Sequence, residues 1–130
     1  MLRRNEKIAF HGGAWVFPGG RVDVADGVDD ELDVARRAAV RETYEETGLV
    51  IGLTDMLPFA HWTTPVQLPK RFATWFFVAA VQGTPKVTID DSEIVDSAWL
   101  SPAQALAMHA LGELELPAPT FGTLLGFARH

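Results

Sequence analysis

The most constraining feature of this 130-residue chain is a group of three glutamates at the end of a predicted helix. Glu42, Glu45 and Glu46 follow an Ala/Arg-rich run that begins near Glu31, and Gly48 provides a helix stop. At about 100° per residue, the three carboxylates fall within roughly 100° of the helix circumference, so they can converge on one point. Because adjacent carboxylates repel one another, the pattern indicates a bound hard cation, with Mg²⁺ or Mn²⁺ as the natural candidates.

The alternative interpretation, a solvated acidic turn, would suit a lone Glu-Glu pair, but the pattern here is longer. The sequence Arg-Glu-x-x-Glu-Glu-x-Gly from Arg41 to Gly48 resembles the core of the Nudix hydrolase signature. It is preceded by Phe-Pro-Gly-Gly-Arg-Val-Asp at residues 17–23, which resembles the family's approach to that signature. The match departs from the family at Asp33, where a Glu is usual, and at Thr43, where an aliphatic residue is usual. Residues 24–30 look like an insertion between turn and helix, which leaves Gly27 doubtful as the first glycine of the signature.

The resemblance implies an α/β protein with the Nudix fold, a mixed β-sheet sandwiched between helices, formed by residues 1–130 as a single domain. It implies a metal-dependent hydrolase of diphosphates in which Glu42, Glu45 and Glu46 hold Mg²⁺ and Arg41 orients a carboxylate. The proton acceptor stays open between Glu46 and Glu93, the latter being either a base or a solvated acid of its loop. The expected substrate-binding residues are Gly19, Gly20, Arg21 and Trp62, although a packing role for Trp62 is an equal alternative.

Local patterns predict the other elements. Alternating or continuous apolar runs indicate strands at residues 14–17, 49–59, 71–81 and 93–100, with 71–81 in the centre of the sheet because it is apolar on both faces. Helices are expected at 31–47, at 103–111 after the capping residue Ser101, and at 121–128, where Thr120 is the candidate cap.

Composition excludes several classes of protein. The net charge of −6 argues against a nonspecific nucleic-acid surface. The chain has no cysteine, which excludes disulfide frameworks and is compatible with the cytoplasm. No apolar run is long enough for a membrane span and no signal-peptide core follows Met1, so we expect a soluble, cytoplasmic protein.

Substrate and assembly depend on features outside the signature. Short motifs spread over most of the chain, among them His-Gly-Gly at residues 11–13, resemble the Nudix branch that includes acyl-coenzyme A diphosphatases. Coenzyme A or acyl-coenzyme A is therefore the best single prediction, with ADP-ribose, dinucleotides or oxidised nucleotides as alternatives, and a non-catalytic nucleotide-binding domain as another. Nudix domains usually have a strand ahead of the segment resembling Leu2-Arg3-Arg4. Its absence would leave an open sheet edge, which predicts a homodimer.

Overall fold

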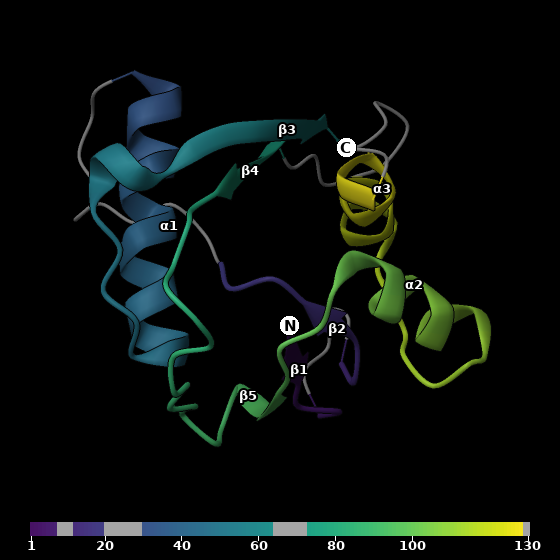
Figure 1. The fold of residues 1–130 in the computed structure, drawn as a ribbon. Helices are drawn as coiled ribbons and strands as arrows, with labels where there is room; N and C mark the ends of the chain where they lie inside the picture. The colour runs from purple at the N-terminus through teal and green to yellow at the C-terminus, as the bar shows by residue number, and fades with distance from the viewer. Residues whose placement is uncertain (8–11, 20–29, 64–72, 129–130) are drawn as a thin grey trace.

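The computed structural model describes residues 1–7, 12–19, 30–63 and 73–128 (Figure 1). The elements, in chain order, are the strands β1 (Leu2–Arg4) and β2 (Trp15–Val16), the helix α1 (Glu31–Thr47), the short 3-10 helix η2 (Leu53–Asp55), the strands β3 (Leu57–Thr63), β4 (Ala73–Val78) and β5 (Ile94–Ser97), and the helices α2 (Pro102–Ala110) and α3 (Ala118–Ala128). In Figure 1, α1 stands on one side of the strands, and α2 and α3 stand on the other.

The described strands form two antiparallel sheets. In the first, β1 is the middle strand between β2 and β5, with Leu2 opposite both Val16 and Ser97. The register of β1 against β5 shifts between Arg3 and Arg4, so the ladder is irregular at the end of β1. Leu2 is almost completely buried, which fits its place in a central strand.

The second sheet consists of β3 and β4, paired from Leu57 opposite Val78 to Thr63 opposite Ala73. Residues 71–81 were expected in the centre of a sheet, and among the described strands β4 pairs only with β3. Because residues 20–29 and 64–72 lie outside the described part of the chain, the central position stays a prediction. Both faces of β4 carry aromatic contacts with other elements: Phe76 is edge-on to Phe17, and Phe77, on the opposite face, lies beneath the guanidinium of Arg36.

The strand expected at residues 49–59 begins only at Leu57. The cause lies in the end of α1: Gly48 adopts a left-handed conformation with φ 76°, and the hydroxyl of Thr47 accepts a hydrogen bond from the N–H of Leu49. The chain then passes through η2, and Val50 is 82% exposed. Its apolar character therefore does not mark a buried strand at this position.

Helix α1 spans the predicted residues, and Ala38 and Glu46 are buried while Tyr44 is exposed. Helix α2 begins at Pro102 with Ser101 and Gln104 forming a reciprocal capping box, as the Ser-Pro pair predicts. Helix α3 begins at Ala118, so Thr120 is a buried residue within the helix and not its cap. The principal apolar cluster lies between α2, α3 and the chain joining them, and consists of Ala105, Leu114, Leu116 and Leu124.

None of the helices in the described residues is long and apolar enough to cross a membrane. Both edges of β1 are paired with strands of the same chain. The homodimer therefore stays a prediction.

Candidate active site

The last two turns of α1 carry the three signature glutamates into different environments. Glu46 is buried, with an exposed fraction of 6%, and its Oε2 accepts a hydrogen bond of 3.0 Å from the backbone N–H of Gly19. The side chain of Glu42 is 17% exposed, whereas that of Glu45 is 54% exposed. The two sequence motifs therefore meet at Glu46, 27 residues apart in the chain.

Burial dominates the electrostatics of Glu46. Desolvation raises its pKa to about 7, the Gly19 N–H opposes that rise, and the nearby charges of Glu42 and Glu93 add to it. The guanidinium of Arg4 acts in the opposite direction and lowers the pKa. Four charged side chains thus interact electrostatically: Glu42 and Glu46 of α1, Glu93 of the loop before β5, and Arg4 of β1.

Arg41 contacts two of the glutamates. Its Nη1 lies 2.9 Å from Oε1 of Glu42 and 3.3 Å from Oε2 of Glu45. Within the described part of the chain, no three His, Cys, Asp or Glu side chains come close enough together to hold a metal ion. In this structure the three glutamates do not converge on one point: Glu46 is buried, whereas Glu45 is exposed and paired with Arg41.

Glu93 is positioned by hydrogen bonds that the sequence analysis did not anticipate. Oδ1 of Asp90 accepts hydrogen bonds from the N–H groups of Ser92 at 2.9 Å and Ile94 at 3.0 Å. From the other side, Asn5 donates its backbone N–H to the carbonyl of Glu93 and its side-chain amide to the carbonyl of Ser92, both at 2.8 Å. The available signal was the Asp-x-Ser spacing, which is typical of a side chain that closes a turn on its own backbone.

The turn formed by residues 90–94 stabilises the charged form of the Asp90 carboxylate. Burial alone would raise the pKa of Asp90, but the N–H groups of Ile94, Ser92 and Glu93 outweigh that effect and lower it. Asp90 therefore remains a backbone-bound carboxylate at neutral pH, and Glu93 is the acid whose charge reaches Glu46.

Trp62 packs on helix α3. A Cβ atom added to Gly122 would lie 2.4 Å from Cζ2 of the Trp62 ring, so the indole rests directly on the helix backbone. The neighbouring His61 stacks on Trp75, with 4.2 Å between ring centroids. These contacts support the packing role for Trp62, and its stacking on substrate stays a prediction. Gly20, Arg21 and Gly27 lie outside the described residues.

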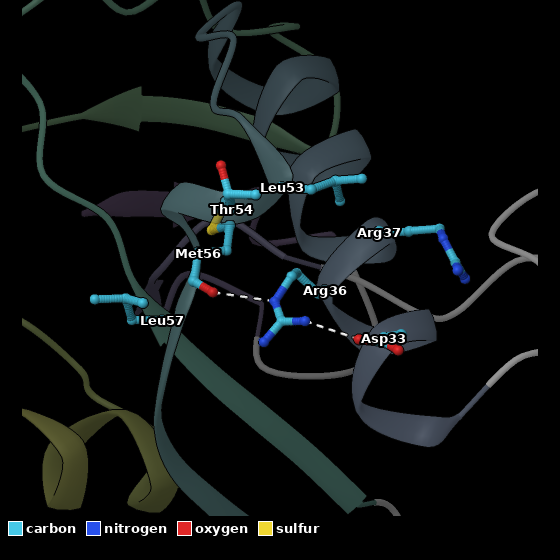
Figure 2. Close-up of a pocket in the computed structure, with 7 residues that line it drawn as sticks. All are labelled: Asp33, Arg36, Arg37, Leu53, Thr54, Met56 and Leu57. Atoms are coloured by element: carbon cyan, nitrogen blue, oxygen red, sulfur yellow. Dashed lines mark hydrogen bonds and ion pairs between the residues drawn. The ribbon is translucent and has the colours of Figure 1, made fainter.

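A separate pocket of about 360 Å³ lies beside the first half of α1 (Figure 2). Arg36 crosses it, donating from Nε to the carbonyl of Met56 at 3.1 Å and pairing with Asp33 at 2.8 Å. Arg36 precedes Glu46 by ten residues, about 15 Å along the helix axis, so this pocket is not part of the glutamate site. Asp33, one of the two residues that depart from the signature, forms this ion pair with Arg36. The pocket is lined by Asp33, Arg36, Arg37, Leu53, Thr54, Met56 and Leu57.

The structure is an α/β domain in which a helix that ends in acidic residues contacts a glycine turn. Comparison with known families makes the assignment specific. The family model described as NUDIX domain matches residues 1–118, and the chain belongs to this family.

Individual relatives are distant. The chain is 26% identical over 155 aligned residues to a protein described as putative nudix hydrolase 7 from Caenorhabditis elegans, covering 92% of this chain and 52% of that protein. It is 20% identical over 216 residues to the acyl-coenzyme A diphosphatase NUDT19 from Xenopus laevis, covering 93% of this chain and 57% of that protein. The chain thus spans little more than half the length of these curated relatives.

A solved structure confirms the expected fold. The crystal structure of a NUDIX hydrolase from Alicyclobacillus acidocaldarius superposes with a TM-score of 0.83, covering 95% of this chain and 79% of that one at 22% identity. The α/β Nudix fold predicted from the two motifs is therefore correct.

Proposed function

We propose that this protein is a metal-dependent hydrolase that cleaves a diphosphate linkage in a nucleoside-diphosphate-type substrate. The observation that carries the proposal is the environment of Glu46. This buried carboxylate is held by the N–H of Gly19 and lies within the fields of Glu42 and Glu93. Concentrating negative charge in a partly buried place is costly unless a cation balances it, and family membership supports a divalent one.

The donor set suits Mg²⁺ or Mn²⁺. Carboxylate oxygens are the ligands that these hard cations prefer, and this site offers several from α1 and the loop before β5. Glu42, Glu45 and Glu46 would hold the ion. Glu45 is exposed and contacts Arg41 at 3.3 and 3.4 Å, so it would exchange this contact for the ion.

When bound, the metal polarises the diphosphate and lowers the pKa of a coordinated water. The protein's own groups would orient the carboxylates and accept the proton. Arg41 keeps the carboxylates of Glu42 and Glu45 oriented, and the N–H of Gly19 fixes Glu46. Glu93 would take the proton of the attacking water, because Glu46 would be committed to the cation whereas the side chain of Glu93 is exposed.

For the substrate, we propose coenzyme A or an acyl-coenzyme A. Support comes from the motifs shared with that branch of the family and from the similarity to a protein named as an acyl-coenzyme A diphosphatase. We further propose that the protein acts in the cytoplasm, on a small molecule, without a nucleic-acid polymer or membrane as partner. Its net charge of −6 is unfavourable for binding either polyanionic surface.

The test is a panel of diphosphates with Mg²⁺: coenzyme A, its 3′-dephospho form, ADP-ribose and a dinucleoside polyphosphate. We expect the highest kcat/KM for coenzyme A or an acyl derivative. A preference of roughly tenfold or more, about 1.4 kcal/mol, for ADP-ribose or the dinucleotide would replace the substrate assignment and leave the chemistry intact. If no diphosphate is cleaved while nucleotides still bind, the domain is a binding module.

The matched control for this assay is a pair of variants on the same helix. Glu46→Gln removes the buried carboxylate, and Glu31→Gln makes the same chemical change at an exposed position at the start of α1. Cleavage that is lost in the first variant and kept in the second assigns the activity to this site and not to a contaminating phosphatase.

A further inference from the structure

The chain segment that carries Glu93 is bound to the glutamate helix at its start and to the sheet at its end. The N–H of Thr88 donates to the carbonyl of Thr47, the last residue of α1, at 2.8 Å. Five residues beyond Thr88 comes Glu93, and Ile94 then begins β5, which pairs with β1. In Figure 1 this segment passes the lower end of α1 on its way to β5. The backbone therefore leads residues 88–94 directly from the end of α1 to the sheet.

Asn5, the residue after β1, holds the two peptide groups that flank the Cα atom of Glu93. Its Nδ2 donates to the carbonyl of Ser92 and its backbone N–H donates to the carbonyl of Glu93, both at 2.8 Å. The first carbonyl belongs to the peptide group before Glu93, and the second belongs to the peptide group after it. Because each peptide group is planar, the orientations of these two planes set φ and ψ of Glu93. Asn5 therefore directs the Cα–Cβ bond of Glu93.

The turn before Glu93 has a conformation that needs such bonds. Asp91 has a φ of 65°, in the left-handed region, which costs a residue other than glycine roughly 1 kcal/mol. Ser92 and Glu93 are both exposed, so hydrogen bonds hold them in place more than core packing does. Oδ1 of Asp90 binds the turn to itself through the N–H of Ser92, whereas Nδ2 of Asn5 binds it to the end of β1.

We propose that the side chain of Asn5 is a positioning residue for Glu93. This inference rests on the proposed function, in which Glu93 takes the proton of the attacking water. A general base must lie within hydrogen-bond reach of that proton, and a displacement of about 1 Å can slow a reaction about 10²-fold. The bond from Nδ2 to the carbonyl of Ser92 prevents such a displacement by fixing the peptide group before Glu93.

The alternative role for the Asn5 side chain is purely structural. Its Oδ1 accepts a hydrogen bond of 3.0 Å from the N–H of Lys7, which shapes the chain between β1 and β2. The two roles use different atoms of the same amide: Nδ2 for the turn of Glu93, and Oδ1 for the chain after β1. Substitutions that treat the two atoms differently can therefore separate the roles.

The experiment compares Asn5→Ala, which removes both atoms, with Asn5→Asp. The aspartate keeps an oxygen acceptor for the N–H of Lys7 but replaces the donor with an oxygen that repels the carbonyl of Ser92. Lys7→Gln is the matched control, because it lowers the net charge by the same amount as Asn5→Asp at an exposed position. kcat and KM are measured at saturating Mg²⁺ with the panel member that the wild type cleaves fastest. Each Asn5 substitution is also combined with Glu93→Gln.

Asn5→Ala and Asn5→Asp should each lower kcat by about tenfold or more and leave KM within about twofold, because the base moves and the binding groups do not. In the Glu93→Gln protein the same substitutions should lower kcat by less than about twofold, because Asn5 acts through the group that is already lost. A structural role would lower kcat by the same factor in both proteins. Lys7→Gln should change neither kinetic constant.

A second measurement is independent of activity. In isotope-labelled, metal-free protein, the nuclear magnetic resonance coupling between the amide and Hα protons of Glu93 reports its φ. We expect this coupling to change in Asn5→Ala and in Asn5→Asp, and to keep its wild-type value in Lys7→Gln. A change confined to the signals of residues 5–7 would show that the amide shapes only the chain after β1, and would contradict the proposal.

The proposal is also overturned if Asn5→Asp keeps the wild-type kcat while Asn5→Ala loses it, since the bond to Lys7 is then the one that matters. Equal losses of kcat with and without Glu93→Gln would overturn it as well. Should Asn5→Ala fail to fold, as its thermal transition will show, Asn5→Asp decides.

Failure of the proposed function gives a different result. If the wild type cleaves no member of the panel, or if Glu93→Gln keeps the wild-type kcat, the hydrolase or its base is wrongly assigned, and this inference fails with it. If kcat falls in Glu93→Gln and stays at the wild-type value in both Asn5 variants, only the role of Asn5 is wrong.

Discussion

The backbone N–H of Gly19 donates to Oε2 of Glu46 across 3.0 Å, joining the glycine turn after β2 to the last turn of α1. A buried carboxylate has few ways to satisfy its oxygens, so this bond orients Glu46 and leaves its other oxygen for a ligand. The relationship makes Glu46 the reference point for the predictions that follow.

Glu45→Gln and Glu46→Gln should each lower kcat by at least ~10²-fold at saturating Mg²⁺, about 2.7 kcal/mol in barrier. Both substitutions keep the side-chain size and remove a negative charge where a divalent ion is held. Steady-state assays on the best substrate provide the measurement, with Glu31→Gln as the exposed control on the same helix. Near wild-type turnover in both variants would exclude these residues as metal ligands.

Glu93→Gln should lower kcat by about 10²- to 10⁴-fold if Glu93 is the general base. Asp90→Ala, which removes the acceptor for the N–H groups of Ser92 and Ile94, should lose much of the same activity by displacing Glu93. Asp90→Asn keeps an oxygen acceptor and should retain most of it. A loss below about fivefold in Glu93→Gln would make Glu93 a solvated acid of its loop. Equal losses in the two Asp90 variants would give Asp90 a charge-dependent role of its own.

The metal-free protein should lose stability as the pH rises from about 4.5 to about 7, because of Glu46. Its pKa is raised from 4.5 in the unfolded chain to about 7 in the fold, so the folded state holds the proton more tightly over that interval. The resulting loss in the free energy of unfolding is absent below pH 4.5 and complete above pH 7, where it reaches about 3 kcal/mol. The measurement is urea unfolding in the presence of a chelator, for the wild type and for Glu46→Gln, which has no titrating group at this position. The free energy of unfolding of the wild type should fall relative to that of the variant as the pH rises through this interval. If the difference in the free energy of unfolding between the two proteins does not change with pH, the prediction is wrong.

Gly122→Ala should destabilise the protein by about 1–3 kcal/mol, although alanine is the better helix former. The added Cβ would lie 2.4 Å from the ring of Trp62 and would force the indole off α3. Thermal unfolding measures the cost. Gly126→Ala is the control, since its Cβ would meet Phe59 at an ordinary 3.9 Å. Trp62→Leu should relieve the penalty at position 122, and no relief would mean that the clash is absorbed elsewhere.

The protein should sediment as a homodimer at micromolar concentration. The exposed apolar side chains Val50, Leu53 and Leu57 follow the end of α1 and offer surface that association would cover. Analytical ultracentrifugation measures the mass, against 14.2 kDa for one chain. A single species of ~14 kDa would rule the dimer out.

The parts of the molecule that follow from the sequence alone are those whose causes are local. Helix α1 ends at Thr47 because Gly48 can take a left-handed conformation, and α2 starts at Pro102 because Ser101 and Gln104 cap each other. The acidic spacing from Glu42 to Glu46 is likewise a property of the sequence, and together with the Phe-Pro-Gly-Gly motif at residues 17–23 it predicted the family correctly. Each of these features depends on hydrogen bonds or angles that span no more than a few residues.

Tertiary structure alone decided which charges meet. Gly19 donates to Glu46 from 27 residues away in the chain, and the charges of Arg4 and Glu93 act on Glu46 from other elements of the fold, relationships that no periodicity encodes. The same holds for the separation of Glu45 from Glu46: their helical spacing permits convergence, but burial of one and the ion pair of the other with Arg41 divide them. Helical angles define the direction of a side chain, whereas burial and long-range partners determine its charge and its final position.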